Sequence, residues 1–86
     1  MVEIQQTTQF TKSFESLPTS IQKRTVKTIS LFKSDPHHPS LRNHKLKGKL
    51  SHLRSISVTM KYRILFTYVE DEVVLILDIG IHELYR

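Results

Sequence analysis

The sequence predicts an α+β fold, β-α-α-β-β-β, with a two-helix hairpin packed on one face of an antiparallel meander sheet. Two late runs, Tyr62–Val69 and Val73–Ile81, are rich in β-branched, aromatic and aliphatic residues, which is typical of a β-hairpin. Apolar residues at helical spacing precede them between residues 8 and 34. The chain has 86 residues, so we expect residues 1–86 to form a single domain that buries roughly two thirds of its unfolded surface.

The N-terminal segment predicts a strand followed by a helix. Residues 2–7 alternate weakly between apolar and polar side chains, which favours a short edge strand. Thr8 or Thr11 can cap a first helix, which Pro18 interrupts. The apolar face of this helix consists of Phe10, Phe14 and Leu17. We expect these aromatic residues to lie in the core rather than in a binding site.

A second helix is predicted from a cap at Thr19 or Ser20 to about Ser34. Its apolar stripe consists of Ile21, Thr25, Thr28, Ile29 and Phe32. The side chains expected toward water are Gln22, Lys23, Lys27 and Lys33. Asp35-Pro36 ends the helix, because proline disfavours α geometry in the residue before it.

The segment after this helix is predicted to be a basic loop and a strand. Residues 41–49 form the loop, with Gly48 as its turn, and residues 53–58 form the strand. Ile56 and Val58 point to the core, and by parity Arg54 shares their face. A role for Arg54 in a site on the other face would require a bulge or a strong twist.

The register of the last hairpin follows from the alternation of side chains. We expect an even loop centred on Asp71-Glu72, because a slip of one residue would bury Asp78. The bulkier faces are Tyr62, Ile64, Phe66 and Tyr68 on one strand and Val73, Leu75, Leu77 and Ile79 on the other. The expected pairs are Ile64 with Ile79, Phe66 with Leu77, Arg63 with Gly80 and Lys61 with His82. Lys61, Arg63 and His82 should then leave the sheet away from the core, beside a glycine that leaves room for a ligand.

The charges are segregated along the chain, which carries a net charge of +5. All eight acidic residues lie outside residues 36–69, whereas this window holds seven of the 13 Lys and Arg residues. Such a distribution suits a phosphate backbone, although a solvated basic loop explains it equally well.

Several classes of function are excluded or disfavoured. The chain has no cysteine, which removes disulfides, thiolate nucleophiles and thiolate zinc sites. His37-His38 has no third ligand at a suitable spacing, so we expect neither a metal nor a cofactor. No long apolar run or cationic leader is present, which favours a cytoplasmic protein with no membrane contact.

The spaced combination of Leu46-Lys47-Gly48, Tyr62-Arg63 with its apolar strand, and Gly80-Ile81-His82 resembles a known pattern. It is similar to the RelE/ParE superfamily of toxins from type II toxin–antitoxin systems, especially the RelE, YafQ and YoeB-like mRNA interferases. The resemblance implies a microbial-ribonuclease-like domain that cuts mRNA in the ribosomal A site without a metal. It also implies an acidic antitoxin as partner and a toxin–antitoxin hetero-oligomer.

The resemblance assigns roles to individual residues. Arg63 would stabilise the transition state, and His82 would transfer a proton. Tyr85 would stack on a base or orient the phosphate, and Arg54 matches a basic position of strand two. The expected RNA-binding residues are His44, Lys45, Lys47, Lys49 and Lys61. Arg63 and His82 could instead be a surface arginine and a strand-end histidine, and Tyr85 could pack the tail onto the sheet.

The chain departs from the YafQ-like pattern at three positions. Ser57 and Lys61 stand where those members have a histidine and an aspartate, and Asp78 stands where they have an arginine. The second proton-transfer partner is therefore missing or replaced. Two alternatives remain open: a ParE-like inhibitor of DNA gyrase, and a weakened member that only binds its antitoxin.

Overall fold

The computed structural model describes residues 1–81 of the chain. Its helices are α1 (Thr8–Glu15) and α2 (Thr19–Ser34), and two short 3₁₀ turns are η1 (Pro39–Leu41) and η2 (Gly48–Leu50). Its strands are β1 (Glu3–Gln6), β2 (His44–Lys45), β3 (Arg54–Ser57), β4 (Tyr62–Glu70) and β5 (Val73–Ile81). The predicted order of elements is confirmed, and β2 is an additional short strand within the segment expected to be a loop.

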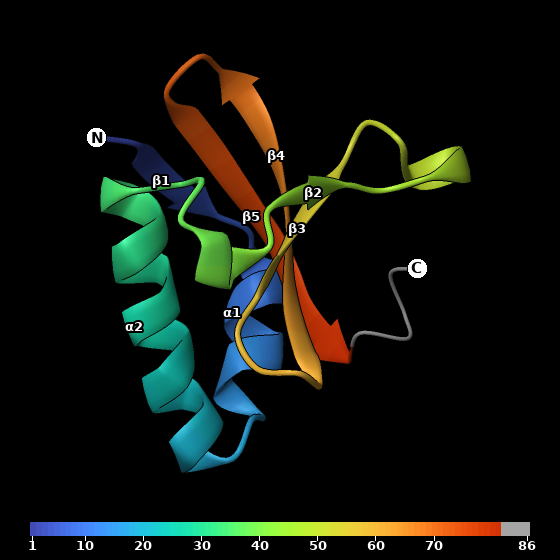
Figure 1. The fold of residues 1–86 in the computed structure, drawn as a ribbon. Coiled ribbons are helices and arrows are strands. Elements are labelled where there is room, and N and C mark those ends of the chain that lie inside the picture. The colour runs from blue at the N-terminus through green and yellow to red at the C-terminus, as the bar shows by residue number, and fades with distance from the viewer. Residues whose placement is uncertain (82–86) are drawn as a thin grey trace.

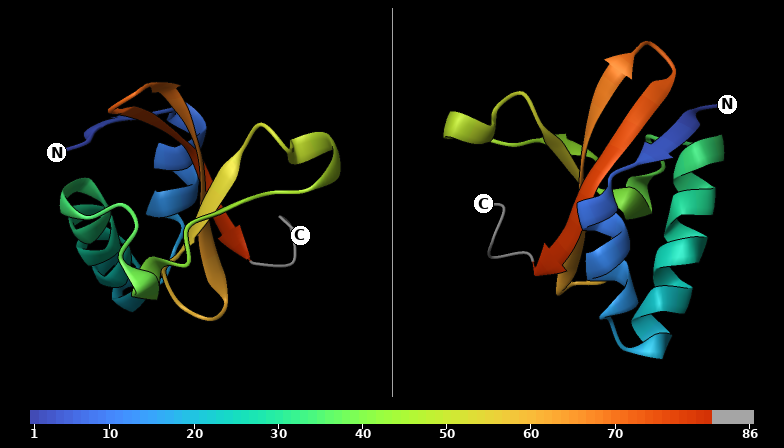
Figure 2. Two further views of the ribbon diagram at one scale, coloured as in Figure 1. Left: turned by 45° about the horizontal axis from the view of Figure 1, so that its top comes forward. Right: turned by 180° about the vertical axis from the view of Figure 1, so that it is seen from behind.

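Both helices cover the same face of a five-stranded sheet, as Figures 1 and 2 show from three sides. The strand order is β1-β5-β4-β3-β2, and β2 to β5 form the expected antiparallel meander. The sheet as a whole is mixed, because β1 lies at the edge and runs parallel to β5. Within the described residues, no helix has the length and hydrophobicity needed to cross a bilayer.

The helix ends differ from those expected. The cap of α1 is Thr7, whose hydroxyl accepts from the backbone N–H of Phe10 at 3.0 Å. Pro18 precedes α2, so neither Thr19 nor Ser20 caps it, and its first turn has no side-chain cap. Gln22 does not simply face water: its Nε2 donates to the carbonyls of Phe14, Glu15 and Leu17. These bonds join the start of α2 to the end of α1 and to the loop between the two helices.

The core lies between the helices and the inner face of the sheet. Phe32 of α2 and Phe66 of β4 are fully buried, and their ring centroids lie 4.9 Å apart in an edge-to-face arrangement. Phe10 is also buried, and Phe14 and Leu17 pack against the same cluster, which confirms the core role of the first helix. Burial of side chains of this size contributes roughly 1.5 to 3 kcal/mol each.

The β4–β5 hairpin has the expected two-residue turn but an unexpected register beyond it. Ile64 pairs with Ile79 and Arg63 with Gly80, as predicted. Phe66, however, pairs with Ile76 rather than Leu77. A bulge between the pairs Leu65–Asp78 and Phe66–Ile76 adds one residue to β5. Between the bulge and the turn, the buried residues of β5 are therefore Val74 and Ile76, where Val73, Leu75 and Leu77 were expected, and Ile79 is buried as predicted.

A second irregularity shifts the register near the tip of the hairpin. Tyr68 pairs with Val74 and Glu70 with Val73, so Val69 has no partner in β5. Tyr68 was expected in the core but is 37% exposed. Its ring lies 5.8 Å from that of Phe66 and lines an open cavity.

Candidate nucleic-acid interface

The face of the sheet opposite α1 and α2 (Figure 1) is called the open face below, and the strand register aligns two rows of residues across it. One row runs across β3, β4 and β5 and consists of Ser57, Arg63 and Gly80. The next row begins on β2 and consists of His44, Ser55, Leu65 and Asp78. The buried row Ile56, Ile64 and Ile79 lies between them. Since side chains alternate along a strand, both outer rows point away from the helices.

The Arg63 side chain is fixed by the turn that joins β3 to β4. Its Nη1 donates to the carbonyls of Thr59, Met60 and Tyr62. Only 6% of the residue is exposed, so it is not the free surface arginine that the sequence suggested. Within residues 1–81, all hydrogen-bond partners of the guanidinium are reached through Nη1. Nε and Nη2 therefore have no partner from this part of the chain.

The electrostatic surroundings of Arg63 favour an anion. Burial lowers the pKa of its guanidinium, and the nearby charge of Arg42 lowers this pKa further. Within residues 1–81, the groups that accept from Nη1 are neutral carbonyls and not carboxylates. A desolvated cation beside a second cation gains free energy when a negative charge binds to it. A planar guanidinium held in this way suits the bidentate binding of a phosphate.

His44 lies on the open face with its tautomer fixed. Its Nδ1 lies 2.8 Å from the carbonyl oxygen of Arg42, which can only accept, so Nδ1 carries the proton. The lone pair is then on Nε2, which lies 3.5 Å from the hydroxyl of buried Ser55. Arg42 has left-handed backbone geometry (φ 50°, ψ 44°), a conformation that non-glycine residues rarely adopt. This turn aims the carbonyl at the imidazole and leaves a basic nitrogen on the open face.

The lysines of the predicted interface are all exposed. Lys45, on β2, pairs with Arg54 and shares its face of the sheet, whereas Lys47 and Lys49 lie on the segment that follows β2, which projects from the sheet on the side away from the helices (Figures 1 and 2). Gly48 has φ +67° in this segment, and nothing lies within 4 Å of a Cβ placed there. The turn therefore requires glycine for its backbone conformation and not for space. Lys61 lies in the β3–β4 turn, with its Nζ 5.6 Å from the ring centroid of Tyr62.

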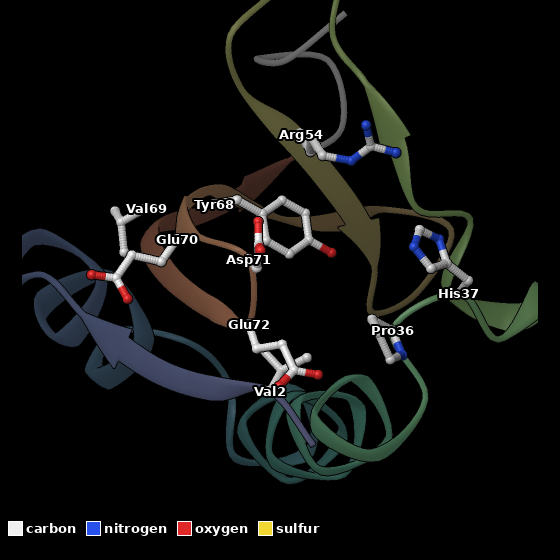
Figure 3. A pocket seen from close by; sticks show the side chains of 9 residues that line it. All are labelled: Val2, Pro36, His37, Arg54, Tyr68, Val69, Glu70, Asp71 and Glu72. Carbon is white, nitrogen blue, oxygen red and sulfur yellow. The ribbon is translucent and has the colours of Figure 1, made fainter.

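Arg54 does not join Arg63, because it lies on the other face of the sheet. It pairs with Phe66, and β3 has neither a bulge nor a register shift against β4. Its Nε donates to Oδ1 of Asn43 at 2.8 Å, and Asn43 donates in turn to the carbonyl of Pro36. Arg54 lines a cavity of about 650 Å³ with Tyr68 and the acidic tip of the β4–β5 hairpin (Figure 3). The structure thus separates Arg54 from Arg63.

Two expected catalytic residues, His82 and Tyr85, lie outside the described residues, as does the predicted pairing of Lys61 with His82. The last described pair of the hairpin is Tyr62 with Ile81.

Among residues 1–81, no three His, Asp or Glu side chains are grouped so that they could hold a metal ion. His38, considered above as a possible metal ligand, caps η1: its Nδ1 accepts from the backbone N–H of Ser40 at 3.2 Å.

Two features of this region were not predicted from the sequence. The contact of His44 with the Arg42 carbonyl depends on a left-handed turn at an arginine, for which the sequence gives no signal. A small basic cavity beside α2 was also missed, although Arg24, Lys27 and Thr28 follow one helical face by their spacing.

No family model matches the sequence, and no curated protein matches it. Solved structures match its fold over nearly the whole chain. YafQ from E. coli has a TM-score of 0.77 and 14% identity, with 98% of this chain and 97% of YafQ covered. A YoeB/ParE toxin from Agrobacterium tumefaciens has a TM-score of 0.77 and 14% identity, covering 94% of this chain and 99% of the other. The archaeal RelE–RelB complex from Pyrococcus horikoshii has a TM-score of 0.74 and 20% identity, with 93% of each chain covered.

The chain has the RelE-like toxin fold. The fold predicted from the spaced motifs is therefore confirmed. In this RelE-like fold, the helices close one face of the sheet and leave the other to Arg63 and His44. Because the matched structures are at most 20% identical in these three cases, the roles of the two residues are argued from their own geometry.

Proposed function

We propose that the chain is the toxin of a type II toxin–antitoxin pair and that it cleaves messenger RNA without a metal. The observation that supports this most directly is the arrangement of the open face. It presents a guanidinium fixed by backbone carbonyls and, in the next row of the same face, a histidine whose Nε2 is an acceptor in the neutral ring, with the Ser55 hydroxyl as a long donor at 3.5 Å. These are a phosphate-binding cation and a proton acceptor, which the cleavage of RNA by its own 2′-hydroxyl requires.

The reaction forms one bond and breaks one bond at the scissile phosphorus. His44 Nε2 takes the proton of the 2′-hydroxyl, and the oxygen attacks the adjacent phosphorus. The bond to the 5′ oxygen breaks, and a second group donates a proton to this leaving oxygen. His82 and Tyr85 are the proposed donors, and Arg63 stabilises the charge that develops on the phosphorane. The products are a 2′,3′-cyclic phosphate and a 5′-hydroxyl.

The exposed lysines complete the proposed interface. Lys47 and Lys49 project beyond the sheet, Lys45 lies on β2, and Lys61 lies in the turn that also holds Arg63. Contacts from these cations to the phosphate backbone give affinity but do not read the sequence. We propose that they hold messenger RNA across the open face, on the ribosome and in the cytoplasm.

We also propose an acidic antitoxin as the partner. The RelE of the archaeal complex was solved together with RelB, which supports a similar partner here. An acidic, partly disordered segment complements the cations of the open face and can fold as it binds. Such a partner would cover Arg63 and His44 while it is bound.

The proposal is tested by incubating the purified chain, freed of divalent metal by prior dialysis against EDTA, with ribosome-bound mRNA in a magnesium buffer that keeps the ribosome intact and with free mRNA in the presence of EDTA. We expect cleavage of the ribosome-bound message and fragments that end in a 2′,3′-cyclic phosphate. The same preparation is tested for inhibition of supercoiling by purified DNA gyrase. Inhibition of gyrase with intact mRNA would replace this proposal by the ParE-like alternative. Antitoxin binding without either activity would identify a member that has lost its catalysis.

A further inference from the structure

A cavity of about 190 Å³ lies between α2 and the segment from η1 to β3, outside the interface described above. Its volume corresponds to about six water molecules in the liquid. The polar residues that line it are Arg24, Lys27, Thr28, Ser40 and Ser57. Among residues 1–81, no carboxylate lines it, and its apolar walls come from Leu31, Leu41 and Val58.

The donors of this cavity suit a phosphate group. Two cations and the hydroxyl of Thr28 line the cavity, and phosphate oxygens accept hydrogen bonds from both kinds of group, whereas the hydroxyls of Ser40 and Ser57 already bond to His38 and to the Thr59 carbonyl. Arg24, Lys27 and Thr28 reach the cavity from one face of α2, since they are three and four residues apart. Nη2 of Arg24 also donates to the carbonyl of Val58 at 3.4 Å, which orients the guanidinium toward β3.

Ser57 connects this cavity to the open face. It lines the cavity and is also the partner of Arg63 across β3 and β4. The hydroxyl of Ser57 and Nη1 of Arg63 both donate to the carbonyl of Thr59. A strand whose phosphate lies on Arg63 can therefore continue over the end of β3 into the cavity.

We infer that the cavity binds a backbone phosphate of the RNA, next to the phosphate held by Arg63. This inference rests on the proposed function, because the strand must cross the open face first. A phosphate of RNA is favoured over an acidic peptide because Ser57 joins the cavity to the row that holds Arg63, where the scissile phosphate is proposed to bind, and the two cations stand at this continuation of the strand. The cavity extends the binding surface from the sheet onto α2.

The test measures the binding of a short single-stranded RNA at a series of salt concentrations. The RNA carries 2′-O-methyl groups, so it cannot be cleaved and binding is read separately from catalysis. The variant is Arg24→Gln with Lys27→Gln, and the control is Lys23→Gln with Lys33→Gln, which removes equal charge from exposed positions of α2 outside the cavity. We expect the cavity variant to weaken binding about tenfold and to lower the salt slope by about 1 to 2. The control should change both values much less.

A second variant, Thr28→Val, removes one hydroxyl of the cavity and leaves the net charge unchanged. It should weaken binding several-fold with no change in the salt slope. Equal losses in the cavity variant and its control would overturn the inference while leaving the proposed function intact. So would unchanged RNA binding with weakened binding of a polyglutamate peptide, which would identify a protein site. Failure of the unmodified chain to bind the RNA would overturn the inference, and the cleavage of ribosome-bound mRNA would then show separately whether the proposed function stands.

Discussion

Ser57 and Arg63 lie opposite one another on β3 and β4, and both side chains donate to the same acceptor, the carbonyl of Thr59. The arginine proposed to bind the scissile phosphate therefore also closes the turn between these strands. Its guanidinium must hold this turn before RNA arrives, so the position of the cation is set by folding and not by the substrate. Such preorganisation is what electrostatic stabilisation of a transition state requires.

Arg63→Ala should therefore impair both folding and catalysis. Loss of the carbonyl contacts of Nη1 should cost about 1 to 3 kcal/mol of unfolding free energy, since bonds from a charged donor are among the stronger ones. For a chain of this size, each kcal/mol lowers the melting temperature by roughly 4 to 8 °C. Single-turnover cleavage at a temperature where the variant is folded should fall by roughly 10² to 10³. Thermal melts and cleavage assays on the same preparation measure both.

Arg63→Lys and Ser57→Ala are the matched variants for this prediction. Lysine keeps the charge and can reach one carbonyl, so Arg63→Lys should recover part of the stability but little of the cleavage, because it lacks the planar fork. Ser57→Ala removes the weaker of the two donors to Thr59 and should change stability by about 1 kcal/mol or less. Wild-type stability in Arg63→Ala would contradict the structural role of the guanidinium.

His44→Ala should lower cleavage by roughly 10² to 10⁴ if its Nε2 accepts the proton of the 2′-hydroxyl. His44→Gln should not restore the rate, because glutamine cannot exchange protons near neutral pH. Both variants should melt close to the unmodified chain, since His44 is exposed. The binding of 2′-O-methyl RNA provides the control, and a loss of binding equal to the loss of rate would assign His44 to RNA binding alone.

The three lysines of β2 and the projecting segment should act together on affinity. Changing Lys45, Lys47 and Lys49 to Ala should weaken RNA binding at low salt and reduce the salt slope by about 2, because each phosphate contact on a single strand contributes about 0.7. The rate of cleavage at saturating RNA should stay nearly constant. Titrations at several salt concentrations measure the slope, and an unchanged slope would remove this segment from the interface.

The parts of the fold that were predicted correctly are those in which polar residues determine where a turn lies. Asp71-Glu72 fixed the turn of the hairpin, and the pairs Ile64 with Ile79 and Arg63 with Gly80 followed from it. The bulge in β5 could not be predicted, because residues 73–77 are all apolar and either face of the strand satisfies the pattern. As a result, Phe66 was assigned to the wrong partner although its burial was predicted correctly.

For the candidate site, the alternation of side chains along a strand predicted only the face of the sheet on which each residue lies. Parity placed Arg63 on the open face and Arg54 on the inner face, and the structure has both there. Parity could not reveal that backbone carbonyls at the turn between β3 and β4 would bind the Arg63 guanidinium. It also could not reveal that Arg42 would adopt a left-handed conformation beside His44. These contacts depend on loop geometry, which side-chain periodicity does not encode.

The last prediction concerns His82, which follows Ile81 at the end of β5. If its imidazole donates the proton to the leaving 5′ oxygen, His82→Ala should reduce single-turnover cleavage by roughly 10² to 10⁴. His82→Gln should be equally slow, because an amide donates a hydrogen bond but not a proton. An RNA with a 5′-phosphorothiolate at the scissile bond separates this role from others, since its sulfur leaves without protonation. Both His82 variants should recover most of their rate on this substrate, whereas His44→Ala and Arg63→Ala should not. Full activity of His82→Gln on ordinary RNA would remove His82 from the chemistry and leave Tyr85 as the proposed donor.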